Sequence, residues 1–149
     1  MSMRPPAPHP LPPAPILWVG LGCQQATSRG LIEVAIREVF RRYHLTEGAI
    51  AGIATIDSKA NVAGLVGFCR DRHLPLRYFS AEMLGSVSVP NPSGNVESRV
   101  GTPSVAEAAA ILGCRIWSMG RGERLLIGKQ IFRLREHPGA VTIAVAQTQ

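Results

Sequence analysis

One polar turn of the sequence carries a carboxylate and an amine close together. Asp57 and Lys59 follow the apolar run 49–56, which is typical of a strand, and in open α/β sheets ligands gather where parallel strands end. Only two of the sixteen basic residues are lysines, Lys59 and Lys129, so a lysine in this turn indicates a deprotonatable amine or a compact point charge. The turn is therefore a candidate ligand site. The alternative is a helix cap by Asp57 with a solvated Lys59.

Further polar turns follow along the chain. Ser80 and Glu82 come after the apolar run 76–79, so their hydroxyl and carboxylate are expected at the same edge of the sheet, although Ser80 fits a simple N-cap equally well. Two later proline-containing turns carry amide and hydroxyl groups that can form the wall of a pocket. Their candidate residues are Asn91 and Ser93 in the first turn and Gly101, Thr102 and Ser104 in the second.

A glycine-rich turn separates the first apolar run from the first helix. Gly20 and Gly22 permit close approach of a ligand to the backbone, and the free N–H groups of the following helix can hold an anion. The next glycine is Gly30, which leaves only half of a dinucleotide fingerprint, so a carboxylate-binding turn is favoured over a nucleotide site. Cys23 lies where a helix dipole would lower a thiol pKa, which would allow it to act as a nucleophile. The alternative is that Cys23 is a small buried residue with a structural role.

Strands and helices are expected to alternate. Apolar runs predict strands at 16–20, 49–56, 76–79, 124–131 and 141–146, the last two joined by a turn at 136–139. Helical spacing and caps predict helices from Thr27 or Ser28 to Tyr43, from 62 to 73, from 80 to 84, and from a Thr102 cap to a stop at Gly113. For residues 114–122 the sequence is compatible both with an extension of this helix and with a loop.

This alternation implies crossover connections and hence an α/β fold. We expect a single three-layer α/β/α domain over residues 16–149, with a mostly parallel mixed sheet and a C-terminal antiparallel hairpin. Seven of the twelve prolines lie in the first fifteen residues, a composition that cannot fold on its own, so residues 1–15 are predicted to be a disordered proline-rich tail.

Composition excludes several classes of function. No apolar run reaches the roughly 18 residues of a membrane span, and no secretory signal is visible, so we expect a cytoplasmic protein without membrane contact. The three cysteines and four histidines are scattered, which predicts neither a disulfide framework nor a bound metal, and no cofactor is expected. The net charge is +6, but the few aromatic residues are not interleaved with arginines, which argues against nucleic acid.

Several of these segments, taken in order, resemble the signatures of the CbiG/CobE family, the C-terminal domain of cobalt-precorrin-5A hydrolase. The matching segments are 20–23 with 27–28, 54–59, 79–82, 90–93, 100–108, and the closing strands 125–129 and 141–145. The chain departs from the family pattern at two places. Gln24 stands where a basic residue is usual, and Asn61-Val62 where an acidic pair is usual.

The resemblance implies an activity in cobalamin biosynthesis on a precorrin or cobalt-precorrin tetrapyrrole. The family reaction opens a δ-lactone of the macrocycle and expels a two-carbon fragment. Under that reading Asp57 is the general base, and Lys59 or Lys129 stabilises the oxyanion. The alternative is a freestanding, non-catalytic CobE-like module that binds a precorrin or hands it to neighbouring pathway enzymes such as precorrin methyltransferases. A flavodoxin-like nucleotide-binding protein is a more distant third hypothesis.

Overall fold

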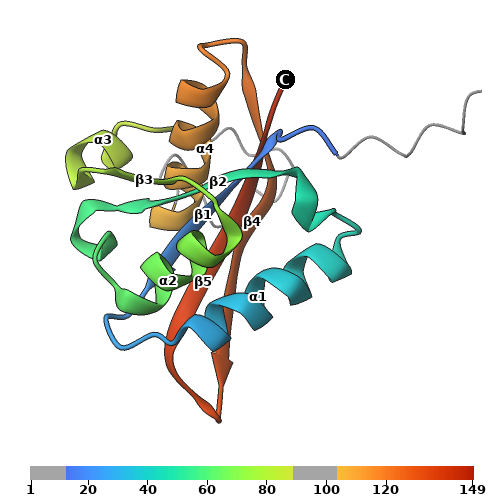
Figure 1. Cartoon of the computed structure of the whole chain (residues 1–149). Helices are drawn as coiled ribbons and strands as arrows, with labels where there is room; N and C mark the ends of the chain where they lie inside the picture. The colour runs from blue at the N-terminus through green and yellow to red at the C-terminus, as the bar shows by residue number, and fades with distance from the viewer. Residues whose placement is uncertain (1–12, 89–103) are drawn as a thin grey trace, which may run out of the picture.

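The structure, a computed structural model, describes residues 13–88 and 104–149. Strands and helices alternate through these residues (Figure 1). The elements are, in order, β1 (Leu17–Cys23), α1 (Arg29–Arg42), η1 (Glu47–Ala49), β2 (Ile50–Ile56), η2 (Asp57–Lys59), α2 (Ala63–Arg72), β3 (Leu76–Phe79), α3 (Ala81–Gly85), α4 (Val105–Trp117), β4 (Glu123–Leu134) and β5 (His137–Thr148). None of the described helices is both long and apolar enough to cross a membrane.

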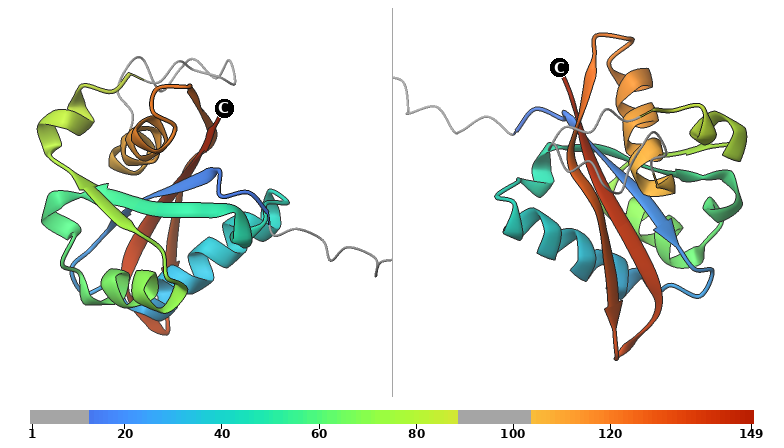
Figure 2. Two further views of the ribbon diagram at one scale, coloured as in Figure 1. Left: turned by 45° about the horizontal axis from the view of Figure 1, so that its top comes forward. Right: turned by 180° about the vertical axis from the view of Figure 1, so that it is seen from behind.

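The strands of these ranges form one mixed sheet with the order β3-β2-β1-β5-β4. β1 and β2 pair in parallel, as do β2 and β3, whereas β5 runs antiparallel to both β1 and β4. Figure 2 shows α1 and α2 on one side of the sheet and α4 on the other. The expected three-layer α/β/α architecture with a closing antiparallel hairpin is therefore confirmed.

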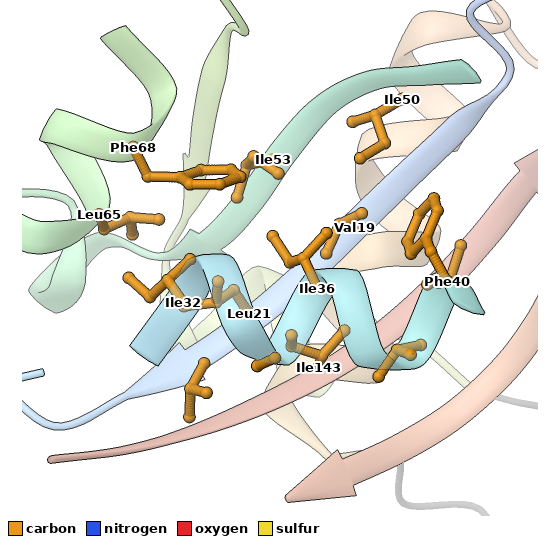
Figure 3. Close-up of a cluster of buried hydrophobic side chains, with 14 of the residues drawn as sticks. Val19, Leu21, Ile32, Ile36, Phe40, Ile50, Ile53, Leu65, Phe68 and Ile143 are labelled. Atoms are coloured by element: carbon orange, nitrogen blue, oxygen red, sulfur yellow. The ribbon is translucent and has the colours of Figure 1, made fainter. Parts of the chain in front are cut away.

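Two apolar clusters hold the layers together. In the first, α1 turns Ile32, Ile36 and Phe40 toward the sheet at helical spacing, where they meet Val19 and Ile143 (Figure 3). In the second, the alanine-rich face of α4 covers the opposite face of the sheet. Because strand side chains alternate between faces, β1 contributes to both clusters.

The break predicted at Gly20 and Gly22 is wrong, because β1 continues through both glycines to Cys23. Packing on the other side of the sheet explains Gly20: a Cβ there would lie 1.8 Å from the Ala106 carbonyl oxygen of α4. The glycine lets helix and strand approach closely, and the strand geometry itself is ordinary.

The predicted ends of α4 are also corrected. Its N-cap is Ser104, whose hydroxyl accepts from the Glu107 N–H while the Glu107 carboxylate accepts from the Ser104 N–H, a reciprocal capping box. The predicted cap Thr102 lies outside the described residues. The helix continues through Gly113 to Trp117 because Gly113 packs on the Trp18 ring, where a Cβ would be 2.6 Å from Cε3.

The closing hairpin is longer than predicted. β4 reaches Leu134, which pairs with His137, so the turn is formed by Arg135 and Glu136 instead of by 136–139. The segment His137–Gly139 begins β5, with Gly139 at a φ of +94° that favours glycine. The hairpin end therefore projects beyond the other strands, at the bottom of Figure 1.

Candidate functional site

The carboxyl ends of the three parallel strands and the beginning of β5 form one edge of the sheet, which we call the carboxyl rim. Cys23 pairs with Val141 there, and Ile56 pairs with Phe79. The first turns of α1, α2 and α3 follow these strands directly, and α4 also begins on this side, since Ala106 lies over Gly20. The rim thus gathers the positive ends of several helices, which favour anionic groups.

The predicted Asp57–Lys59 turn lies at this rim and is joined to the loop that follows β1. The amide Nε2 of Gln25, in the β1–α1 loop (residues 24–28), donates to the Ser58 carbonyl over 3.1 Å. Asp57 is exposed and Lys59 half-buried in the 3₁₀ turn η2. The two loops are far apart in sequence, and their contact brings Lys59 close to the end of β1.

Lys59 lies close enough to Cys23 to influence the pKa of that thiol. Burial, the largest influence, raises the pKa of the Cys23 thiol, while the positive charge of Lys59 and a side-chain hydrogen bond with Thr27 act in the lowering direction. The depressed pKa that helix-dipole reasoning suggests is therefore not what the structure gives. A protonated thiol favours a packing or contact role for Cys23 over a nucleophilic one.

On its other side the β1–α1 loop is hydrogen-bonded to the start of β5, at the end of the β4–β5 hairpin. Three bonds go to backbone carbonyls: Thr27 Oγ1 to Ala140 at 3.1 Å, Ser28 N to Pro138 at 3.2 Å, and Gln24 N to Ala140 at 3.3 Å. Ser28 Oγ also lies 3.4 Å from His137 Nδ1 and accepts from Leu31 N as the N-cap of α1. Predicted residues Thr27 and Ser28 are thus held rigidly, Thr27 fully buried.

A depression of about 600 Å³ opens between the first turns of α1 and α2. It is lined by residues 25–30 together with Ala63, Gly64 and Gly67. At Gly64, α2 packs against the β1–α1 loop, since a Cβ there would lie 2.5 Å from the Thr27 carbonyl oxygen. Arg29 stands in its wall, exposed and paired with Glu33 at 3.5 Å and with Asp71. The helix N–H groups of the first turn suit a carboxylate, whereas the Arg29 guanidinium already pairs with two carboxylates of the chain.

The remaining predicted residues lie along the same rim or outside the described chain. Ser80 Oγ accepts from Met83 N over 3.1 Å as the N-cap of α3, and Glu82 is exposed in the first turn of that helix. Gly22 is half-buried near the end of β1, and Ser104 caps α4. The candidates outside the described residues are Asn91, Ser93, Gly101 and Thr102.

Lys129 lies apart from the other two proposed catalytic residues. It is exposed on β4, and β1 and β5 stand between β4 and β2 in the sheet. Three strand spacings of about 4.8 Å, roughly 14 Å in all, lie between β4 and β2. The structure therefore does not bring Lys129 together with Asp57 and Lys59.

Two residues that the motifs did not single out support the site. Glu107 is buried, and besides capping α4 its Oε2 accepts from the Lys129 N–H over 3.0 Å, which ties the helix start to β4. The pattern Ser104-x-x-Glu107 is a capping-box signal that could have found it. His137 had no such signal, because its partner Ser28 lies 109 positions away in sequence. Among the described residues no cluster of His, Cys, Asp and Glu could hold a metal ion.

Comparison with known proteins finds relatives of this chain. Residues 17–146 match the family model described as Cobalamin synthesis G C-terminus. The chain is also 29% identical over 97 residues to a curated cobalt-precorrin-5A hydrolase from Priestia megaterium. That alignment covers 65% of this chain but 26% of the hydrolase, so the chain spans about a quarter of the length of this curated relative.

Solved structures have the same fold. Cobalamin biosynthesis protein chiG from Agrobacterium tumefaciens str. C58 is 27% identical with a TM-score of 0.64, over 89% of this chain and 98% of that chain. CobE, a protein from the cobalamin (vitamin B12) biosynthetic pathway, is 24% identical with a TM-score of 0.70, over 95% of this chain and 96% of that chain. The CobE likeness shows the fold.

Proposed function

The chain belongs to the cobalamin synthesis G C-terminus family and is related to cobalt-precorrin-5A hydrolase, and from that premise we propose that its carboxyl rim binds a precorrin and opens its lactone. The observation that carries the proposal is the junction of the β1–α1 loop with the Asp57–Lys59 turn. There a carboxylate, an ammonium group and the start of α1 stand at one edge of the sheet.

The residues of the turn have complementary roles in this proposal. Hydrolysis of a lactone needs a base that removes a proton from water and a cation that stabilises the oxyanion. The water oxygen bonds to the lactone carbonyl carbon as its proton passes to the Asp57 carboxylate, and the Lys59 ammonium group faces the negative oxygen. The acyl C–O bond then breaks as the carbonyl re-forms, and the ring oxygen takes the proton that Asp57 accepted, which leaves a hydroxyl group and a carboxylic acid and restores the Asp57 carboxylate.

The depression beside the turn supplies a site for a carboxylate arm of the macrocycle. Its wall includes the first turn of α1, whose N–H groups favour an anion, and Gln25 belongs to both the wall and the junction with Ser58. An arm bound there would hold the ring beside the Asp57–Lys59 turn. At Gly67 an added Cβ would meet, among the described residues, only Arg29 Cδ, 3.6 Å away, so this side of the depression has room for such an arm.

A non-catalytic role is the second candidate, because the alignment covers only part of the hydrolase and the groups that catalyse its reaction can lie outside the aligned region. The matched hydrolase is about four times as long as the aligned region, because the alignment covers 26% of it. The remaining part of that protein can supply catalytic groups that a precorrin-binding or carrier module would not need. In that case the rim would bind the tetrapyrrole and pass it to another pathway enzyme.

One experiment separates these two functions. The purified full chain is incubated with cobalt-precorrin-5A, and the absorption spectrum and products are followed. Product formation supports the hydrolase, and a stoichiometric spectral shift without products supports the carrier. Absence of both binding and turnover overturns the proposal.

Substitutions then test the proposed residues. Asp57→Asn should lower turnover by about 10²-fold or more, since general bases contribute roughly 10² to 10⁴, and Lys59→Met by a similar factor. The matched controls are Glu47→Gln, at the other end of β2, and Arg37→Met, exposed on α1; both should leave turnover unchanged. Unaltered turnover in Asp57→Asn would remove Asp57 from the mechanism.

A further inference from the structure

The β4–β5 hairpin carries a second set of positive charges past the carboxyl rim. Phe132 and Cys23 both pair with Val141, so this row marks the end of β1. The chain continues beyond it on β4 and returns on β5, with Leu134 pairing with His137. We call residues 133–137 the hairpin tip. It stands beside the β1–α1 loop as a wall that the other strands do not reach (Figure 1).

The hairpin tip is fixed in place by the loop it contacts. Immediately after it, Pro138 and Ala140 accept hydrogen bonds from residues of the β1–α1 loop. The ring of His137 lies so close to Gly30 that a Cβ there would be 2.7 Å from Cε1. The loop therefore has the depression on one side and the hairpin tip on the other, and both structures share Ser28 and Gly30.

Charge distinguishes this wall from an ordinary hairpin. Arg133 and Arg135 are exposed, and neither has an ion pair within the described parts of the chain. Glu136 is the only acidic residue of the hairpin tip, and His137 adds a partly exposed imidazole. Two unpaired guanidinium groups on a rigid support are suited to bind carboxylates through paired N–H donors.

We propose that the hairpin tip is a second carboxylate-binding site, in which Arg133 and Arg135 hold acidic arms of the substrate while the depression holds another. This inference rests on the proposed function, because it assumes a large ligand fringed with carboxylates. A macrocycle held on both sides of the β1–α1 loop has its ring over the rim. Arg133 and Arg135 are positioning residues, and they take no part in proton transfer.

Dissociation constants test the proposal, with cobalt-precorrin-5A as ligand and uroporphyrin as a stable carboxylate-bearing macrocyclic probe. The Arg133→Gln/Arg135→Gln variant should bind about threefold to thirtyfold more weakly, the range for two exposed ion pairs. The control Arg121→Gln/Arg124→Gln removes the same charge near the opposite end of β4, where both residues are exposed, and should change binding less than about twofold. Glu136→Gln should tighten binding, since it removes the competing carboxylate.

The outcomes distinguish this site from the proposed function. Equal weakening by both double variants means that overall charge attracts the ligand, and it overturns the hairpin site. Unchanged binding in Arg133→Gln/Arg135→Gln overturns it as well. Suppose that uroporphyrin binds the wild-type chain, and binds Arg133→Gln/Arg135→Gln more weakly than the control, but that cobalt-precorrin-5A does not bind. The hairpin site then stands and the proposed function fails. If neither ligand binds, both are overturned.

Discussion

At the scale of single residues, burial decides the chemistry of the thiols. Cys69 and Cys114 are enclosed in the two apolar clusters, and desolvation raises the pKa of each to about 12 from an ordinary value of 9.0. Their thiols therefore stay protonated at neutral pH. The same effect, partly offset by Lys59, applies to Cys23.

These shifts predict a loss of stability in alkali. The folded-state pKa of Cys69 and Cys114 is higher than the unfolded one, so above about pH 9 the unfolded chain releases protons that the folded chain retains. The free energy of unfolding should be unaffected by these groups below pH 9 and should fall as pH rises from 9 toward 12. Urea unfolding at stepped pH measures this, and the Cys69→Ala/Cys114→Ala variant should show a smaller decline. Equal declines in both proteins would contradict the assignment.

The local roles of single residues could be predicted from the sequence where the partner is near in the chain. Of the two caps considered for the first helix, Ser28 is the one present, and Ser80 takes the N-cap role that was one of its two alternatives; each accepts from the N–H three residues later. The separation of Lys129 from Asp57 and Lys59 depends on the order of strands in the sheet, which single residue types do not reveal.

At the scale of elements, the contact of α2 with the β1–α1 loop and the start of α1 requires a glycine at position 64. Alanine in place of glycine in a helix normally adds up to about 1 kcal/mol of stability. At Gly64, however, the new Cβ would lie 2.5 Å from the Thr27 carbonyl oxygen and 2.7 Å from the Arg29 N. Both are backbone atoms, so α2 must move away from the β1–α1 loop.

We therefore expect Gly64→Ala to be destabilising. Forcing atoms into such a contact costs about 1 to 3 kcal/mol, and widening the gap should weaken tetrapyrrole binding because it distorts the depression. The matched control is Gly85→Ala in α3, where an added Cβ meets nothing within 4 Å among the described residues. Chemical denaturation and ligand titration measure both effects. A Gly64→Ala variant as stable as the control would show that the helices adjust freely.

The bounds of elements were predictable where periodicity and caps act locally. β3 has the predicted bounds, and β2 differs from its predicted run by a single residue. Long-range packing explains the errors. Gly20 was predicted to break the strand, but it is a glycine because α4 packs against it. Gly113 was predicted to end the helix, but it is a glycine because the Trp18 ring packs against it. Glycine signals a turn only when nothing distant requires the space.

At the scale of the whole molecule, alternating strands and helices predicted the layers correctly. The same alternation could not place β5 between β1 and β4, because an antiparallel strand next to the first strand is a pairing across most of the chain. That insertion bears on the proposed site. It brings the hairpin to the rim, where His137 meets Ser28.

The N-terminal boundary of the domain gives a last prediction. Pro15 O accepts from the Trp117 indole over 3.1 Å, Ile16 N donates to Ala49 O at 3.0 Å, and Ile16 O accepts from Thr148 N at 2.9 Å. Removing residues 1–12 leaves these bonds in place and should leave the free energy of unfolding unchanged. Removing residues 1–16 eliminates all three and the packing of Ile16, which should cost about 2 to 5 kcal/mol at roughly 1 kcal/mol per hydrogen bond. Urea denaturation of the three chains measures the difference. A large loss already in the shorter deletion would move the boundary of the folded domain toward the N-terminus.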